Sequence, residues 1–214
     1  MGEIITFAAA AVGTGVSTLA RAFAVEAAYA QDLVIADLDD LPGASWDWGT
    51  RRAAAEFDPA ILVERVPYAQ VLTRAAKIDL LVVDTPVCAD ERIARLAMGS
   101  GLTVVCTRGS VVDVDLSIRL MHAMRERGVQ DWRIVLALCR VQNKEESTFA
   151  RDRLRRAGYD ALQGEVTESR SFGGLQDRGH AITESPVASL VQETFELVQS
   201  IQGAFVSALE RLGA

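Results

Sequence analysis

The residues best suited to chemistry follow the first apolar run of the chain, in the segment Ala9–Thr18, which reads AAAVGTGVST. Gly13 and Gly15 would let the backbone approach a phosphate closely. Ser17 and Thr18 open a predicted helix whose free N–H groups and dipole favour an anion. The segment therefore predicts a phosphate-binding loop. The residues expected to bind a nucleotide there are Val12, Gly13, Thr14, Gly15, Val16, Ser17 and Thr18.

The predicted loop lacks the positive charge that such a loop normally carries. A phosphate-binding loop places a lysine directly before its Ser or Thr, where the ammonium group reaches the β- and γ-phosphates, and here that place holds Val16. Lysine is rare throughout the chain, because Lys77 and Lys144 are the only two among 22 basic residues. A coding bias of that kind replaces lysine by arginine, so it does not account for a valine.

Apolar runs of strand length recur along the chain and alternate with stretches of helical spacing. The runs are continuous in hydrophobicity, which is typical of parallel strands covered on both faces. We therefore predict an α/β fold with a doubly wound, mostly parallel sheet flanked by helices, and a ligand site at the carboxyl ends of its strands. The expected strands are 4–7, 33–36, 61–63, 80–83, 102–105 and 134–137, and the expected helices are 17–30, 68–77, 90–98, 113–127, 145–156 and a last one after Pro186.

The composition predicts one soluble domain spanning residues 1–214. The chain is 50% hydrophobic and 24% charged, which is enough apolar material to fill a core without disulfides or a structural metal. No apolar run reaches the roughly 20 residues that a membrane span needs, so we expect a cytoplasmic protein with no membrane partner. Cys88, Cys106 and Cys139 are widely spaced and are expected to be buried free thiols.

On these residues the chain resembles the ParA/MinD family of deviant Walker ATPases, which segregate plasmids and chromosomes or position cellular structures. Residues 4–20 match the family's first strand, phosphate loop and first helix. Residues 37–48 are similar to its second motif, and residues 79–86, DLLVVDTP, are similar to its Walker B strand almost letter for letter. Residues 166–184 follow its usual C-terminal run. The resemblance covers nearly the whole chain and implies a nucleotide-binding P-loop domain.

The resemblance also implies roles for acidic residues at the strand ends. Asp37 and Asp39 would be the catalytic residues, helping to place the attacking water and Mg²⁺. Ser17 would hold Mg²⁺, and Asp84 would orient a metal-bound water. The implied cofactor is ATP with Mg²⁺, bound weakly or lost in this chain. The alternative is that these carboxylates only end strands and cap turns beside an empty or differently occupied pocket.

The chain departs from the family pattern where the family carries out its chemistry. Ala11 stands at the signature lysine, which in the family reaches across a dimer, and Val16 stands at the phosphate lysine. Cys139 occupies the place of an asparagine that lies near the adenine. Losing a charge-assisted contact to phosphate costs about 1.5–3 kcal/mol, which leaves weak binding. Phosphoryl transfer depends on electrostatic stabilisation, so turnover is expected near background.

Three hypotheses follow from these observations. The first is a ParA-like pseudo-ATPase that acts as a regulatory or binding partner in partition, conjugation or positioning, as a homodimer or with a protein adaptor. The second is an active Mg²⁺-ATPase that segregates DNA or cargo and uses an arginine from elsewhere in place of the lysines. The third is a nucleotide-independent DNA-binding module, contacting DNA without sequence preference through the arginines of residues 151–156. The formal charge of −7 and the interspersed Asp152 favour a solvated helix face instead.

A few further side chains and segments carry weaker expectations. His122 and His180 lack ligand spacing and are expected in surface or packing roles. Residues 173–185, rich in glycine and polar side chains, predict a mobile surface loop. The tryptophans expected in the core or an interface are Trp46 and Trp48, and the arginines expected to border a dimer face are Arg51 and Arg52.

Overall fold

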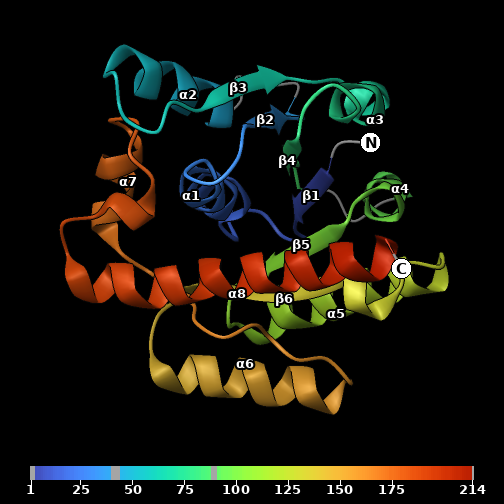
Figure 1. The fold of residues 1–214 in the computed structure, drawn as a ribbon. Helices are drawn as coiled ribbons and strands as arrows, with labels where there is room; N and C mark the ends of the chain where they lie inside the picture. Colours follow the sequence, from blue (N-terminus) through green and yellow to red (C-terminus); the bar gives the residue numbers. More distant parts are fainter. Residues whose placement is uncertain (1–2, 40–43, 88–90, 214) are drawn as a thin grey trace.

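The computed structural model describes residues 3–39, 44–87 and 91–213. At its centre lies a seven-stranded, all-parallel sheet with the order β3-β2-β4-β1-β5-β6-β7, flanked by helices (Figure 1). The predicted doubly wound α/β architecture is therefore confirmed. The strands are β1 (Glu3–Ala8), β2 (Leu33–Asp37), β3 (Leu62–Arg65), β4 (Leu80–Asp84), β5 (Leu102–Thr107), β6 (Ile134–Val141) and β7 (Val166–Thr167).

Helices connect the parallel strands, as crossover connections require. Their ends carry capping residues: the Ser110 side chain accepts a hydrogen bond from the backbone N–H of Asp113, and the Asn143 side chain accepts one from that of Glu146. The helices are α1 (Val16–Ala27), α2 (Ala44–Ala54), α3 (Val71–Ala75), α4 (Glu91–Gly99), α5 (Val111–Glu126), α6 (Lys144–Arg156), α7 (Arg170–Gln176) and α8 (Ala188–Gly213), with short 3₁₀ helices η1 (Tyr68–Gln70), η2 (Asp131–Arg133) and η3 (Ile182–Glu184).

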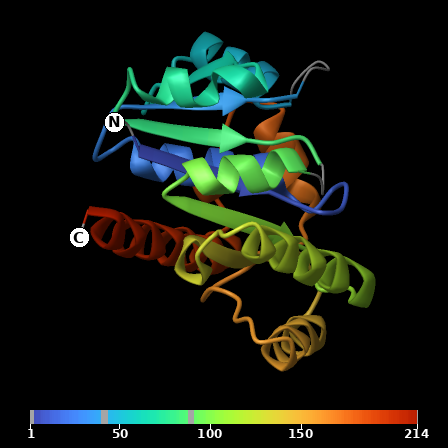
Figure 2. The ribbon, with the colours of Figure 1, turned by 90° about the vertical axis from the view of Figure 1, so that its right-hand side faces the viewer.

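The core lies on both faces of the sheet. Helices α1 and α8 cover one face, where Phe23 packs between Phe7 and Phe205 with ring centroids 5.5 and 6.5 Å away. Helices α4 and α5 cover the other face and stand in front of the sheet in Figure 2. Strands β1, β2, β4 and β5 are buried on both sides because helices cover both faces of the sheet, which explains their continuous apolar runs, whereas the edge strand β3 is partly exposed.

The strand register decides which residues meet at the carboxyl edge of the sheet. Asp84 at the end of β4 is aligned with Phe7 of β1 on one side and with Asp37 of β2 on the other. The loop that follows β1 therefore starts beside these two carboxylates. This edge is where a doubly wound sheet binds ligands.

The structure corrects the prediction of a mobile loop over residues 173–185. The segment carries the last turn of α7 and all of η3, and Ile182 is fully buried against the α1 face of the core. Its glycine and polar content conceals three buried apolar side chains, those of Leu175, Ala181 and Ile182. Two other elements, α2 and β7, were not predicted, because α2 has few apolar residues and β7 has only two residues.

The remaining expectations about side chains can be placed on this fold. Cys106 and Cys139 are free and buried, as predicted, whereas Cys88 lies outside the described residues. Trp48 is fully buried and Trp46 is 39% exposed. Arg52 is also buried, with its guanidinium paired to Glu184 at 2.8 Å, which corrects the expectation that it borders a dimer face. None of the described helices combines the length and the apolar character needed to cross a bilayer.

Candidate functional site

The loop between β1 and α1 has the backbone of an anion-binding turn. Gly13 and Gly15 adopt φ angles of +73° and +92°, which L-residues with side chains rarely adopt. Gly15 is the N-cap of α1, so the first free N–H groups of the helix follow it directly. A Cβ at Gly15 would lie 3.4 Å from Cβ of Cys139 on β6, so the loop also packs closely on the sheet.

A cavity of about 520 Å³ opens beside this loop at the carboxyl edge of the sheet. Its volume is in the range of small-molecule and cofactor sites. Polar and charged side chains from four strand ends and two helices surround it. The lining includes Gly13, Thr14, Gly15, Val16, Ser17, Thr18, Asp37, Asp39, Asp84, Arg140, Glu168, Arg170 and Gln176.

Ser17 and Asp84 form the polar pair expected of a magnesium site. The Ser17 hydroxyl donates to Oδ1 of Asp84 at 3.1 Å, and the Ser45 hydroxyl donates to Oδ2 at 2.6 Å. Ser17 also lines the cavity, and its oxygen can still accept or coordinate there while its hydrogen is directed to Asp84. This donor set of hydroxyl and carboxylate oxygens is the kind that Mg²⁺ prefers, with its other positions taken by water and phosphate.

Burial raises the pKa of Asp84 to about 6, in opposition to the hydrogen bond from Ser45 and the nearby guanidinium of Arg21, which lower it. The side chain is 3% exposed. A carboxyl group that is costly to ionise is a natural partner for a cation, since a positive charge beside it would restore the ionised form. The raised pKa of Asp84 therefore fits a site that binds a metal ion nearby.

Arg21 is a buried cation beneath the loop, and it was not predicted. Its Nε donates to the Ser45 hydroxyl at 3.0 Å and its Nη1 to Oε1 of Gln176 at 2.9 Å. Burial lowers the pKa of Arg21, while the charges of Asp84 and Asp37 raise it. This guanidinium joins α1, α2 and α7 and offsets part of the negative charge at the sheet edge.

Asp37 and Asp39 both lie at the cavity, but they differ in how they are held. Asp37 accepts hydrogen bonds from the backbone N–H of Asp39 at 3.1 Å and from that of Trp46, near the start of α2, at 2.9 Å. It is 3% exposed. The Asp37 carboxylate therefore organises the turn after β2, and Asp39 follows it at the edge of the cavity.

Thr14 places a polar group beside the cavity without a partner in the described part of the chain. Its side chain is 1% exposed, yet its hydroxyl has no hydrogen-bond partner among the described residues. Buried polar groups are nearly always paired, because an unpaired one costs about 1–3 kcal/mol. Since Thr14 lines the cavity, a ligand or water bound there would satisfy it.

Of the other residues expected to bind nucleotide, some line the cavity and others do not. Val16, Ser17 and Thr18 line it, and the Thr18 hydroxyl also donates to Gln176 at 3.2 Å. Val12 and Ala11 are not part of the lining, and the Val12 side chain is 79% exposed. The structure therefore brings together all the predicted loop residues except these two, with Asp37, Asp39 and Asp84.

Several site residues escaped the sequence analysis. Ser45 and Gln176 lie in the segments 37–48 and 166–184 but were not singled out, and Arg140 follows Cys139 without a motif of its own; only the fold brings the three to the loop. Arg21 had a usable signal, because it lies one helical turn after Ser17 and is the one polar residue within 19–25, where a lone arginine needs a buried partner.

Comparison with known proteins supports the fold. No protein-family model matches the chain, and no curated protein is significantly similar to it in sequence. Solved structures match over nearly their full length. The MinC:MinD cell division protein complex of Aquifex aeolicus matches with TM-score 0.69 and 11% identity, covering 94% of this chain and 96% of that one.

Two further structures hold nucleotides. A putative plasmid partition protein from Borrelia burgdorferi B31 bound to AMPPNP matches with TM-score 0.74 and 12% identity, covering 95% of this chain and 99% of that one. The septum site-determining protein MinD from Pyrococcus horikoshii OT3, complexed with Mg-ADP, matches with TM-score 0.73 and 14% identity, covering 94% and 96%. The chain therefore has the ParA/MinD-type P-loop fold.

Proposed function

We propose that this chain is a ParA-like positioning protein that binds an adenine nucleotide with Mg²⁺ weakly and hydrolyses it at a rate near background. The observation that carries the proposal is the cavity of about 520 Å³ beside the glycine loop, which is lined by Thr14, Ser17 and Asp84. Ser17 and Asp84 would hold Mg²⁺ there, and the metal would supply positive charge against the phosphates. The similarity to solved structures that contain AMPPNP and Mg-ADP supports the choice of ligand.

The absence of both family lysines supports a regulatory role. Val16 supplies no charge to the transferring phosphate, and Ala11 cannot reach across a dimer. Phosphoryl transfer is driven by stabilising charge on the phosphate oxygens, so it suffers more than binding does. A protein that binds nucleotide without turning it over would act through a partner, either a second copy of this chain or an adaptor. The solved complex of MinD with MinC offers a precedent for a partner protein on this fold.

The second candidate is an active Mg²⁺-ATPase in which an arginine replaces the missing lysines. The specific observation in its favour is that Arg140 and Arg170 line the cavity. Turnover of ATP well above that of a Ser17→Ala variant, measured with and without DNA, would favour this candidate over the first.

The experiment that tests the proposed function is a titration of the purified chain with a fluorescent ATP analogue up to millimolar concentration, with Mg²⁺ and with EDTA. We expect saturable binding that is tighter with Mg²⁺. Ser17→Ala should abolish the Mg²⁺ dependence, because it removes the hydroxyl that would hold Mg²⁺ beside Asp84. Ser207→Ala, which removes an exposed hydroxyl on α8, is the matched control and should bind as the parent does. Absence of saturable binding by the parent would overturn the proposed function.

A further inference from the structure

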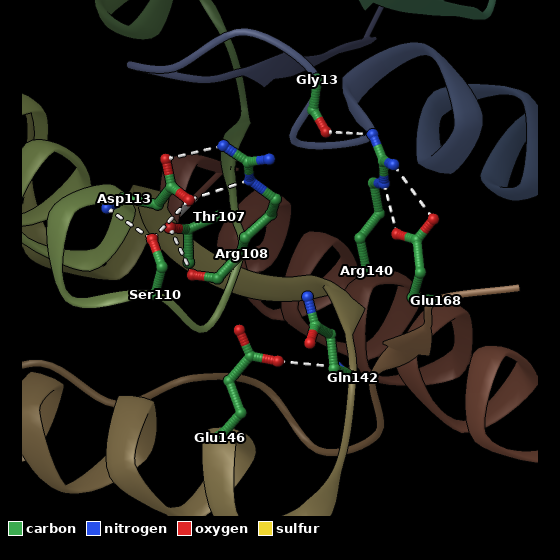
Figure 3. Close-up of polar contacts among 9 residues, drawn as sticks. All are labelled: Gly13, Thr107, Arg108, Ser110, Asp113, Arg140, Gln142, Glu146 and Glu168. Carbon is green, nitrogen blue, oxygen red and sulfur yellow. Dashed lines mark hydrogen bonds and ion pairs between the residues drawn. The ribbon is translucent and has the colours of Figure 1, made fainter.

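One arginine reaches over the glycine loop from the end of β6 (Figure 3). Nη1 of Arg140 donates to the carbonyl oxygen of Gly13 at 2.8 Å. Its Nε and Nη2 donate to the two carboxylate oxygens of Glu168 at 2.5 and 3.0 Å. These contacts hold the guanidinium between the loop and the segment that follows β7.

The backbone of Arg140 is held in an uncommon conformation to place this side chain. Its φ is +55°, and among the described residues Glu56 is the only other non-glycine residue with a positive φ. Residues held in this region cost conformational energy and cluster at ligand clamps and switch regions. The side chain lies close to the loop, since a Cβ at Gly13 would be 3.4 Å from Nη1 of Arg140 and one at Gly15 would be 3.9 Å from its Cγ.

The cavity needs a cation if it is to hold a polyphosphate. Its lining includes four carboxylates, those of Asp37, Asp39, Asp84 and Glu168, against two guanidinium groups, those of Arg140 and Arg170. Only Arg140 also contacts the glycine loop among the hydrogen bonds of the described residues. It is therefore the cation best placed to meet a phosphate that enters the loop.

We propose that Arg140 is the phosphate-contacting residue of this site, and that Glu168 holds its guanidinium until the anion takes over part of that pairing. The inference rests on the proposed function and names the phosphate contact within it. The planar fork that pairs with Glu168 matches phosphate oxygens equally well. The side chains of Arg140 and Glu168 are 44% and 39% exposed, so a ligand can reach the pair.

The chemistry of the pair supports an exchange of partners. The hydrogen bond from Arg140 lowers the pKa of Glu168, so this carboxylate is ionised at neutral pH and competes directly with an anion. Thr14 lines the same cavity, and its buried hydroxyl has no hydrogen-bond partner among the described residues. An arginine that lines the cavity beside a helix N-terminus could bind phosphate without any lysine.

The test uses inorganic tripolyphosphate as the probe, because it carries the phosphates without the base. Binding is measured by calorimetry on the full chain. Arg140→Gly is the primary variant, since glycine accepts a φ of +55° and the fold should be kept. We expect tripolyphosphate to bind this variant about 10- to 100-fold more weakly than it binds the parent. Arg153→Ala is the matched control, because Arg153 makes an equally bidentate, half-exposed pair with Asp115 away from the cavity.

A double-mutant cycle tests the exchange with Glu168. Glu168→Gln should tighten binding in the parent, because it frees Arg140. In the Arg140→Gly background the same change should have a much smaller effect. Equal effects in both backgrounds would overturn the exchange, and unchanged tripolyphosphate binding by Arg140→Gly would overturn the phosphate contact.

The results separate this inference from the proposed function. Nucleotide binding by the parent with no loss in Arg140→Gly overturns the role of Arg140 and leaves the nucleotide site standing. Tripolyphosphate binding that depends on Arg140, without any binding of the ATP analogue, supports Arg140 and overturns the nucleotide assignment. Binding of neither probe by the parent overturns both.

Discussion

Val16 holds the position from which a lysine would reach a bound phosphate, and its side chain lines the cavity although it is only 6% exposed. We expect Val16→Lys to tighten binding of the Mg²⁺–ATP analogue about 10- to 100-fold, because it adds a charge-assisted contact inside a partly enclosed site. Val12→Lys is the control: it adds the same charge to the same loop at a side chain that is 79% exposed. A fluorescence titration that finds equal gains in both variants would show that general attraction, and not the position, is responsible.

The raised pKa of Asp84 predicts that the stability of the fold depends on pH in the absence of divalent cations. Its pKa is raised to about 6 in the folded chain from 3.8, so between about pH 4 and 6 the folded state binds more protons than the unfolded state. The free energy of unfolding therefore falls as pH rises through this window, by an amount on the order of 3 kcal/mol. We expect Asp84→Asn to remove this fall, which makes the variant more stable relative to the parent at pH 7 than at pH 4.

Urea unfolding in EDTA at pH 4, 5, 6 and 7 measures this effect. Asp115→Asn gives a contrast of opposite sign, because the hydrogen bond from Arg153 lowers the pKa of the exposed Asp115. Asp115 therefore contributes stability at neutral pH that is lost as the pH falls. Parallel pH profiles for the parent and Asp84→Asn would contradict the role assigned to burial.

At the scale of the elements, Gly164 fixes how the segment before β7 lies on α8. Its φ is +74°, and a Cβ there would lie 2.3 Å from the backbone nitrogen of Leu197 and 2.7 Å from the carbonyl oxygen of Glu193. We expect Gly164→Ala to lower the free energy of unfolding by about 2–4 kcal/mol, because both the strained backbone and the collision with a helix backbone must be relieved. Denaturant unfolding measures the change.

Gly203 provides the matched control within α8 itself. A Cβ added there would meet nothing within 4 Å, and its backbone is helical. Gly203→Ala should stabilise the chain by about 0.5–1 kcal/mol, since alanine loses less backbone freedom in a helix. Loss of stability in both variants would indicate that α8 tolerates no substitution and that the close approach at Gly164 is not the cause.

The elements also show how far the sequence could predict the site. Strands β1 to β6, the glycine loop and Ser17 with Asp84 were predictable, because continuous apolar runs and glycine spacing are local signals. Arg140 was not, since its role depends on β6 lying two strands from β1 and on a positive φ that its sequence neighbours do not indicate. The prediction of a mobile loop after α7 was wrong for a related reason. The composition of this segment resembles that of a loop, but its buried contacts are made with α1 and α2, which are distant in sequence.

At the scale of the whole molecule, charge bears on the DNA-binding hypothesis. The chain has a formal charge of −7. Three arginines of α6 form ion pairs with carboxylates. The nitrogen-to-oxygen distances are 3.4 Å for Arg151 with Glu165, 2.5 Å for Arg153 with Asp115 and 2.9 Å for Arg155 with Asp152. Nonspecific affinity for DNA comes from cations that neutralise phosphates and release counterions. Helix α6 therefore presents a nearly balanced surface in place of a basic one.

We expect no complex with a fluorescently labelled 30-base-pair duplex in 150 mM salt at micromolar protein, with or without nucleotide, as measured by anisotropy. Nonspecific binders typically reach dissociation constants of about 10⁻⁴–10⁻⁶ M under such conditions through several phosphate contacts, and the paired arginines of α6 leave too few. The triple variant Asp115→Asn, Asp152→Asn and Asp160→Asn removes the carboxylate partners of Arg153 and Arg155, and should bind DNA measurably at 25 mM salt where the parent does not. Submicromolar binding by the parent at 150 mM salt, weakening steeply as salt rises, would contradict this prediction and place the DNA contact on a surface other than α6.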